Sequence, residues 1–195
     1  MGLDFVAIDF ETANRHRHSM CQVGMTRVLD GRVDATLATL VRPPADEHGF
    51  EDMCVDVHGI TADAVAGAPG VAEALALIAG FSAGLPLVAH NAPFDAGVLQ
   101  RSAERSGVVL APVRFACTLA LSRRLAPGLD TYRLASLAEI IGFELVAHDA
   151  GSDSAAAAAL LLWLVARCPD VTDLDGLMAA AGAPWREVGG QPAAR

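Results

Sequence analysis

The stretch VAIDFETANR, residues 6–15, decides how this chain is interpreted, because an apolar run ends there in two carboxylates. Residues 4–11 form the nearly continuous apolar run that is typical of a strand buried on both faces. Side chains alternate between the two faces of a strand, so Asp9 and Glu11 are expected on the same face. Two close carboxylates repel each other, and one tends to take up a proton unless a positive charge lies between them. The pair therefore predicts a positively charged partner.

The composition is that of a globular protein. The chain has 195 residues, of which 53% are apolar and 19% are charged, which is enough for one domain with a real core. We expect one domain over residues 1–183 and a flexible C-terminal tail, rich in Gly and Pro, over residues 184–195. The longest apolar run, residues 155–166, is shorter than the ~18 residues of a membrane span, and no stretch resembles a signal peptide. Contact with a membrane is therefore not expected.

Cysteine usage and charge narrow the class of protein further. The four cysteines are scattered without a C-x-x-C pair, which argues against zinc and disulfides and favours a reducing cytoplasm. The net charge of −9 disfavours broad binding of duplex nucleic acid, although a local basic site is compatible with it. The sequence contains no Walker loop, no G-x-G-x-x-G and no G-x-S-x-G.

The order of the expected elements indicates an α/β domain with a mixed sheet. Residues 20–43 contain two strand-like runs that meet at Asp30-Gly31, a strong hairpin signal. Residues 43–57 are expected to form a polar loop, and Thr61 to cap a short helix. Further strands are expected at 85–89 and 113–118, and helices at 71–81, 93–107, 118–125, 134–142 and 152–168.

Two further segments place an aspartate at the start of an expected helix. In HNAPFD, residues 90–95, Asp95 lies near the positive end of the helix dipole and borders the face that packs on the sheet. In HDAGSD, residues 148–153, Asp153 aligns at helical spacing with an apolar stripe that faces inward. Each aspartate alone is equally compatible with a simple role at a helix terminus.

Together these segments supply four carboxylates and a histidine at the ends of secondary-structure elements. Asp9, Glu11, Asp95 and Asp153 can hold two divalent cations, Mg²⁺ or Mn²⁺, which prefer oxygen ligands. Two such ions ~4 Å apart can clamp a phosphodiester, activate a water and stabilise the leaving oxygen. His148 suits the base that takes the proton from that water, since the unperturbed pKa of histidine is ~6.5. A pair of metal ions is thus the expected partner of the first two acids.

The segments DFET (9–12), HNAPFD and HDAGSD resemble the three motifs of the DEDDh, or DnaQ-like, family of 3′→5′ exonucleases, which includes the proofreading epsilon subunit of bacterial DNA polymerase III. The resemblance covers about residues 4–167. It implies a ribonuclease H-like α/β fold with a five-stranded mixed sheet flanked by helices. It also implies that Asp9, Glu11 and Asp153 hold one metal. Asp9 and, through water, Asp95 would then hold the second, with His148 as the general base.

The same resemblance implies contacts with the substrate. Thr12 matches a position whose backbone meets the terminal nucleotide, and Asn91 matches a residue near the substrate backbone or, equally, a turn or capping residue. The segment VHGIT, residues 57–61, resembles one that lines the pocket of the terminal nucleotide, which nominates Val57, His58 and Ile60. QVG at 22–24 also resembles the family, with a structural role. Gly151 departs from it, because the family tends to have an apolar helix former there.

The sequence thus predicts a metal-dependent 3′→5′ exonuclease that hydrolyses terminal phosphodiesters of single-stranded DNA and releases nucleoside 5′-monophosphates. One alternative is an exoribonuclease or oligoribonuclease that trims RNA 3′ ends. A second, from a different class, is a non-catalytic module that binds nucleic acid. The expected partners are a single-stranded 3′ end and a replication or repair complex, and the residues give no indication of an oligomeric state.

Overall fold

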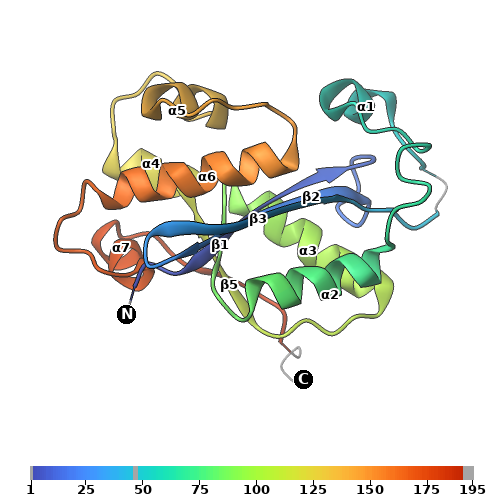
Figure 1. The fold of residues 1–195 in the computed structure, drawn as a ribbon, viewed down its shortest axis with the longest axis horizontal. Helices are drawn as coiled ribbons and strands as arrows, with labels where there is room; N and C mark the ends of the chain where they lie inside the picture. Colours follow the sequence, from blue (N-terminus) through green and yellow to red (C-terminus); the bar gives the residue numbers. More distant parts are fainter. Residues whose placement is uncertain (1, 46–47, 191–195) are drawn as a thin grey trace.

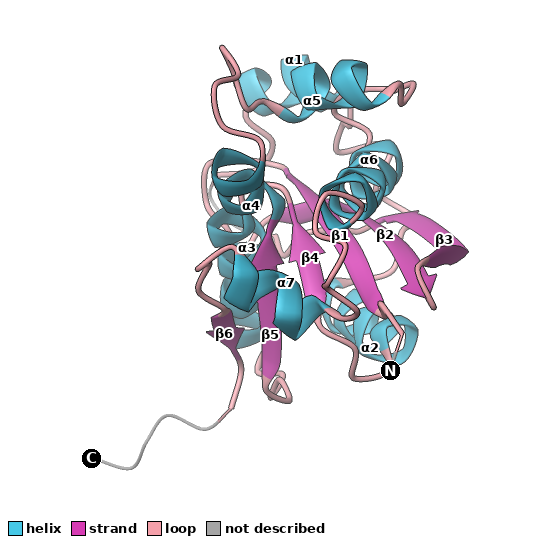
Figure 2. Ribbon diagram, turned by 90° about the vertical axis from the view of Figure 1, so that its left-hand side faces the viewer, coloured by secondary structure: helices cyan, strands magenta, loops and turns pink. Residues whose placement is uncertain are grey.

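The computed structural model describes residues 2–45 and 48–190 and contains one mixed sheet with the strand order β3-β2-β1-β4-β5-β6. The strands are β1 (Phe5–Thr12), β2 (Met20–Leu29), β3 (Arg32–Leu40), β4 (Leu87–Ala89), β5 (Val113–Cys117) and β6 (Arg186–Val188). The helices are α1 (Asp52–His58), α2 (Val71–Ser82), α3 (Ala92–Ser106), α4 (Thr118–Leu125), α5 (Leu134–Ile141), α6 (Ala150–Val165) and α7 (Leu174–Ala180). Figure 1 shows α6 and α2 on opposite sides of the sheet, and Figure 2 shows its strands beside one another, from β6 to β3.

Strand β1 lies at the centre of the sheet, antiparallel to β2 and parallel to β4. The predicted β2–β3 hairpin is confirmed: Leu29 pairs with Arg32 around Asp30 and Gly31, which have φ angles of 48° and 71°. Positive φ at both central residues is the conformation that matches the twist of the flanking strands, and Asp-Gly adopts it readily. The hairpin places β2 beside the strand that carries the first two acids.

The alternation of side chains along β1 supplies both halves of the core. Val6, Ile8 and Phe10 pack with residues of α2 and α3, whereas Phe5 and Ala7 pack with residues of α4, α6 and α7. The odd-numbered side chains therefore face α6, and Asp9 and Glu11 continue this row as the strand leaves the core. The expectation that both carboxylates share one face agrees with this register.

Three expectations about the irregular segments are wrong. The loop expected over residues 43–57 contains α1, whose side chains are all at least partly exposed, so no apolar stripe announces it. Thr61 caps no helix: its hydroxyl accepts a hydrogen bond from the Ala64 amide at 3.3 Å within a turn. The sheet has six strands instead of five.

The sixth strand comes from the segment expected to be a flexible tail. Residues of β6 pair antiparallel with β5, from Val113–Val188 to Phe115–Arg186. The guanidinium of Arg114 lies 4.3 Å from the centre of the Trp185 ring, beside this strand. A strand of three residues is too short to show a periodicity, so the sequence did not reveal it. Residues 191–195 lie outside the described residues, and the division of the chain into one domain and a tail stays a prediction.

The described part of the chain contains no helix with the length and apolar character that crossing a membrane requires.

Candidate active site

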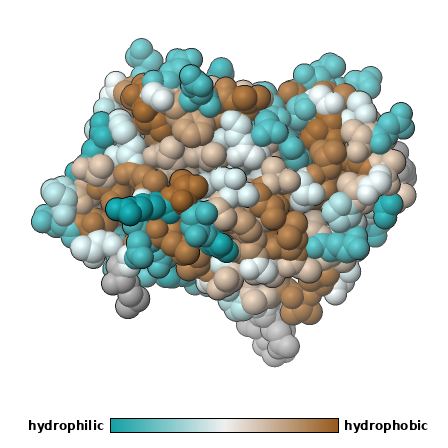
Figure 3. Space-filling view, in the orientation of Figure 1, coloured by the Kyte–Doolittle hydropathy of each residue, from teal (hydrophilic) through white to brown (hydrophobic). Residues whose placement is uncertain are grey.

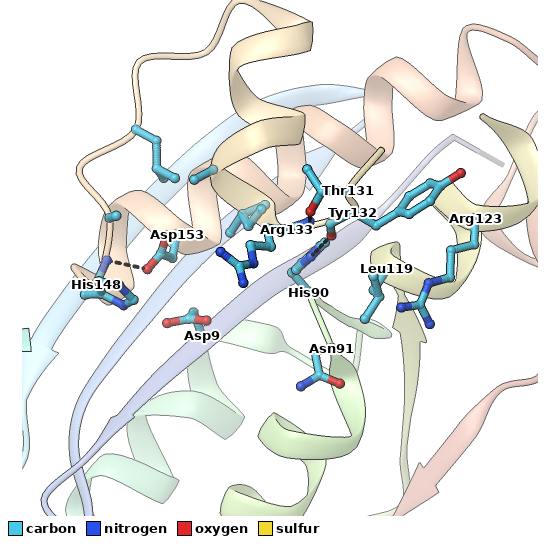
Figure 4. A pocket seen from close by; sticks show the side chains of 14 residues that line it. Asp9, His90, Asn91, Leu119, Arg123, Thr131, Tyr132, Arg133, His148 and Asp153 are labelled. Carbon is cyan, nitrogen blue, oxygen red and sulfur yellow. Dashed lines mark hydrogen bonds between the residues drawn. The ribbon is translucent and has the colours of Figure 1, made fainter. Parts of the chain in front are cut away.

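The four acids come from three elements whose ends meet at one edge of the sheet. Asp9 and Glu11 lie near the C-terminal end of β1. Asp95 lies in the first turn of α3, which follows the parallel strand β4. Asp153 lies in the first turn of α6. Figure 4 shows the Asp9 and Asp153 side chains facing the same cavity, with His148 beside Asp153. The carboxyl ends of parallel strands are the usual place for a site in an α/β sheet.

The entry of α6 is fixed to β2 by hydrogen bonds. The Asp149 side chain caps the helix by accepting the amide of Ser152 at 2.8 Å. The Gln22 side chain accepts the Ala150 amide at 3.1 Å and donates to Asp149 at 3.4 Å. Gln22 thereby ties the first turn of α6, and with it Asp153, to the strand next to β1.

Two glycines allow this helix to approach the sheet closely. A Cβ on Gly24 would lie 1.9 Å from the Ala150 carbonyl oxygen, so a side chain there would push α6 away. A Cβ on Gly151 would lie 3.0 Å from the Cβ of Ala38 on β3. Gly151 lies in the first turn of α6, where the departure from the family pattern has a packing reason. The structural role expected for the QVG segment agrees with the contact at Gly24.

Glu11, Asp153 and His148 form one cluster of potential metal ligands, called the acidic cluster below. Each of these residues has a potential ligand atom, and the three atoms lie within 4.8 Å of one another. The Asp153 carboxylate also accepts a hydrogen bond from the main-chain amide of His148 at 3.0 Å. His148 itself is exposed and has a φ of 62°, at the end of the loop that leads into α6. Its ring is therefore accessible at the rim of the acidic cluster.

Burial and mutual repulsion make the carboxylates of this site reluctant to ionise. Burial, and then the charges of Asp153 and Asp149, raise the pKa of Glu11 to about 7. Burial is also the largest cause that raises the pKa of Asp9 well above its usual value, followed by the charges of Asp95 and the other acids. Burial raises the pKa of Asp153, against the lowering effect of His148.

Asp95 is the most deeply buried of the acids. Its side chain is 1% exposed, and neither carboxylate oxygen has a hydrogen-bond partner among the described residues. Burial raises its pKa well above the usual value, although nearby backbone amides and the charge of Arg17 act in the opposite direction. A buried carboxylate without a partner is strongly unfavourable. Two unpaired oxygens in a cluster of repelling acids fit a divalent cation, which would supply the missing positive charge.

Thr12 and His58 meet at the end of β1. The Nε2 of His58 donates to the Thr12 carbonyl at 3.1 Å, and its Nδ1 accepts the Ile60 amide at 3.0 Å. Both bonds suit a neutral ring, and burial lowers the pKa of His58. Ile60 itself is 8% exposed and packs in a small core cluster, whereas Val57 is 50% exposed on α1. The structure thus brings Thr12 and His58 together, leaves Val57 exposed on the surface and buries Ile60 in the core.

Helices α1 and α5 stand at two corners of the same face of the molecule. Both expose apolar side chains, Met53 and Val57 on α1 and Ile140 on α5. Figure 3 shows apolar surface at both of these upper corners. The C-terminal end of β1 and the start of α6, which carry three of the four acids, lie between the two helices (Figure 1).

A cavity of about 760 Å³ extends from the acids toward α4 and α5. Asn91 lines it, with a φ of 69° at the start of α3 and no capping bond from its side chain. Besides Asp9, Asp153, His148 and Asn91, its lining includes His90, Leu119, Arg123, Tyr132, Arg133 and Leu145. The sequence assigned none of these last six to the site. The arginines are visible in the sequence only as charges in the middle of the chain, and nothing there shows which of them face a cavity.

His90 is a structural part of this wall. Its Nε2 donates to the Tyr132 carbonyl at 3.0 Å, and its Nδ1 accepts from the Thr118 hydroxyl at 2.9 Å. Burial lowers the pKa of His90 to about 4. A histidine with both nitrogens occupied and a low pKa stays neutral and joins β4 to the loop before α5.

Comparison with known proteins agrees with this architecture. Residues 6–161 match the family model RNase_T, described as Exonuclease. The chain is 30% identical over 161 residues to DNA polymerase III PolC-type of Oceanobacillus iheyensis, which covers 82% of this chain and 11% of that protein.

Two solved structures have the same fold. Exonuclease X in complex with 5′ overhanging duplex DNA matches with a TM-score of 0.71 and 24% identity, over 91% of this chain and 99% of that chain. Exonuclease I of E. coli in complex with a dA16 oligonucleotide matches with a TM-score of 0.72 and 22% identity, over 86% of this chain and 42% of that chain. The ribonuclease H-like mixed α/β fold that the sequence predicted is confirmed, with one more strand. The chain spans 11–22% of the length of the curated relatives that it matches.

Proposed function

Because the chain belongs to the exonuclease family, we propose that it is a metal-dependent 3′→5′ exonuclease that releases nucleoside 5′-monophosphates from single-stranded DNA ends. The observation that carries this proposal is the convergence of four carboxylates, including the orphaned pair of oxygens on buried Asp95, beside an exposed histidine. Such a cluster is unfavourable in a protein without a cation, and it has the ligands that two divalent cations prefer.

Asp9, Glu11 and Asp153 would hold one ion, and Asp9 and Asp95 the second, with Mg²⁺ or Mn²⁺ as the cations. Two divalent cations in this position would neutralise charge on the phosphodiester and lower the pKa of a water. The carboxylates would fix the positions of the two cations, and the cations would in turn position the reacting phosphate.

His148 would act as the general base. Its exposed ring can accept a proton from the attacking water at a ring nitrogen, while its main-chain amide, bonded to Asp153, holds the loop against α6. A potential ligand atom of His148 lies within 4.8 Å of those of Glu11 and Asp153, so the ring would stand beside the water that the cations activate.

We assign the terminal nucleotide to the end of β1 and α1. The Thr12 backbone, Val57, His58 and Ile60 would surround it, and Asn91 would lie near the substrate backbone. The bond between His58 and the Thr12 carbonyl holds the end of β1 in place for this contact. Ile60, which is buried, would support the pocket from behind.

DNA is proposed as the substrate over RNA because the similar exonuclease X and exonuclease I structures contain DNA. Similarity to part of PolC-type DNA polymerase III supports a role in replication or repair, with a larger complex as partner.

The test is degradation of matched 5′-labelled single-stranded DNA and RNA with Mg²⁺ or Mn²⁺. We expect a ladder that shortens from the 3′ end of DNA and that disappears with EDTA or in the Asp9→Ala variant. Faster loss of RNA would replace the DNA assignment by exoribonuclease activity. If folded, metal-bound protein shortened neither polymer, the exonuclease proposal would be wrong and a non-catalytic binding role would take its place.

A further inference from the structure

Two arginines in the wall of the cavity form no ion pair with any carboxylate of the described residues. Arg123 lies in the last turn of α4, and Arg133 lies directly before α5. Both line the cavity that contains Asp9 and Asp153. Within residues 2–45 and 48–190, neither guanidinium forms an ion pair or a hydrogen bond. The guanidinium carbon of Arg123 lies 5.9 Å from the centre of the Tyr132 ring.

Most other arginines of the protein are engaged. Four form ion pairs with carboxylates: Arg15, Arg27, Arg101 and Arg114. Four donate to backbone carbonyl oxygens: Arg17, Arg42, Arg124 and Arg167. Arg32, Arg105 and Arg186 are exposed on β3, at the end of α3 and on β6; they do not line this cavity and have no bonded partner in the described part of the chain. The combination of an unpaired guanidinium and a cavity lined by catalytic acids is thus found at Arg123 and Arg133.

The charges along the cavity are separated, with acidic side chains at one end and arginines toward the other. Figure 4 shows His148 and Asp153 at one end, Arg133 between Asp153 and His90, and Arg123 at the far end beside Leu119. A protein with a net charge of −9 repels a polyanion over most of its surface, so binding needs a local positive site. Guanidinium groups bind phosphate oxygens in a bidentate manner, and these two are free to do so.

We propose that Arg123 and Arg133 bind phosphates of the degraded strand on the 5′ side of the bond that is cleaved. This inference rests on the proposed function, which places the terminal nucleotide at α1, on the other side of the acidic cluster (Figure 1). The strand then leaves the acids along the cavity toward α4 and α5, and its backbone passes the two guanidinium groups. The arginines thereby favour substrates with several phosphates over a single nucleotide ester.

The experiment compares the double variant Arg123→Ala/Arg133→Ala with the control Arg32→Ala/Arg105→Ala, which loses the same charge elsewhere. Binding of a short fluorescent single-stranded DNA is measured by anisotropy in EDTA over a range of salt concentrations. Hydrolysis of the same DNA and of the p-nitrophenyl ester of thymidine 5′-monophosphate is measured with Mg²⁺. Circular dichroism and thermal unfolding check that each variant is folded, and Arg123→Lys/Arg133→Lys tests whether positive charge alone restores the effect.

We expect the cavity variant to bind the DNA at least about tenfold more weakly and to lose about 1.4 from the slope of log Kd against log salt, since each phosphate contact on a single strand contributes about 0.7. Its KM should rise more for the DNA than for the ester, and the lysine variant should recover the salt slope. Equal slopes in the cavity and control variants would overturn the inference. Failure of the wild-type protein to hydrolyse either compound would instead sink the proposed function, and the salt slopes would still decide the role of the arginines.

Discussion

His90 and His148 each begin a segment that ends five residues later in a buried aspartate, yet the two segments distribute their hydrogen bonds in opposite ways. At the junction of β4 and α3, both nitrogens of His90 form hydrogen bonds, whereas neither oxygen of Asp95 has a hydrogen-bond partner among the described residues. At the entry of α6, Asp153 accepts a main-chain amide and the His148 ring is exposed.

The comparison shows that residue type alone does not assign a role. A histidine with two hydrogen bonds and a pKa of about 4 cannot exchange protons near neutral pH, so His90 supports the fold. A buried carboxylate without hydrogen bonds is stabilised by a cation, so we assign Asp95 to the proposed metal site. We therefore expect substitution of His90 to lower stability more than activity, and substitution of Asp95 to lower activity without lowering stability. Substitution of His148 should affect activity alone.

The largest effect is expected from Asp95→Asn, which keeps the shape of the side chain and removes its charge. The loss of metal stabilisation should lower kcat at least about 10³-fold, since several kcal/mol of barrier are at stake. In EDTA at pH 8 the same variant should unfold at a temperature about 2–4 °C higher, because a buried charge has been removed. Steady-state kinetics and thermal unfolding measure the two effects. Glu104→Gln, an exposed acid on the same helix, is the control, and an Asp95→Asn enzyme with more than a tenth of the normal kcat would contradict the assignment.

The next effect is that of His148→Ala. Loss of a general base should lower kcat by about 10²–10⁴-fold with little change in melting temperature, because the ring is exposed. Added imidazole should restore part of the rate, since the ring leaves an open space at the rim of the site. Val146→Ala, in the same exposed loop, controls for disturbance of the backbone. A His148→Ala enzyme of normal rate would show that another group takes the proton.

His90→Ala tests the structural role of His90 against the catalytic role proposed for His148. It removes two hydrogen bonds of a partly buried ring, which should cost about 2–3 kcal/mol and lower the melting temperature by about 4–10 °C. The folded fraction should keep kcat within about tenfold, because His90 transfers no proton. The measurements are thermal unfolding and kcat per folded molecule. A loss of rate as large as that of His148→Ala, without a loss of stability, would reverse the two roles.

The smallest effect is the pH dependence of stability in EDTA. Glu11 has a pKa of about 7 in the folded protein and 4.5 as its usual value, so the folded state holds a proton that the unfolded chain has lost between these pH values. The free energy of unfolding should therefore fall as pH rises from 4.5 to 7. Because the Glu11 side chain is only partly buried, solvent screening should limit the decrease in melting temperature to about 2–4 °C. Glu11→Gln should flatten this dependence, and saturating Mn²⁺ should oppose it. A metal-free protein that becomes more stable over this range would contradict the burial of uncompensated acids.

The sequence reveals those parts of the site that depend on local periodicity. The row of side chains on β1 and the first turns of α3 and α6 follow from alternation and helical spacing, so the four acids were found. The partners of His90 are not local: Thr118 and Tyr132 lie 28 and 42 residues away, and only the packed structure brings them together. The same holds for the wall that contains Arg123.

Short elements account for the errors in the fold. Helix α1 buries no side chain completely, and β6 has three residues, so neither carries an apolar pattern long enough to detect. Their positions are decided by pairing with distant segments, such as the β5 strand that receives β6.

Gly24 has a consequence that reaches beyond packing. It is the direct neighbour of Asp9 across the β1–β2 ladder, and its missing side chain is what lets the Ala150 carbonyl approach, three residues before Asp153. The distance between Asp9 and Asp153 thus depends on the absence of a side chain at Gly24, which lies on β2, a strand that contributes no proposed ligand. A methyl group at position 24 would push the start of α6 away from β2. The carboxylates of Asp9 and Asp153 would then lie farther apart, which would weaken the binding of small cations. Position 24 would thus influence which cation the proposed site prefers, although Gly24 is not one of its proposed ligands.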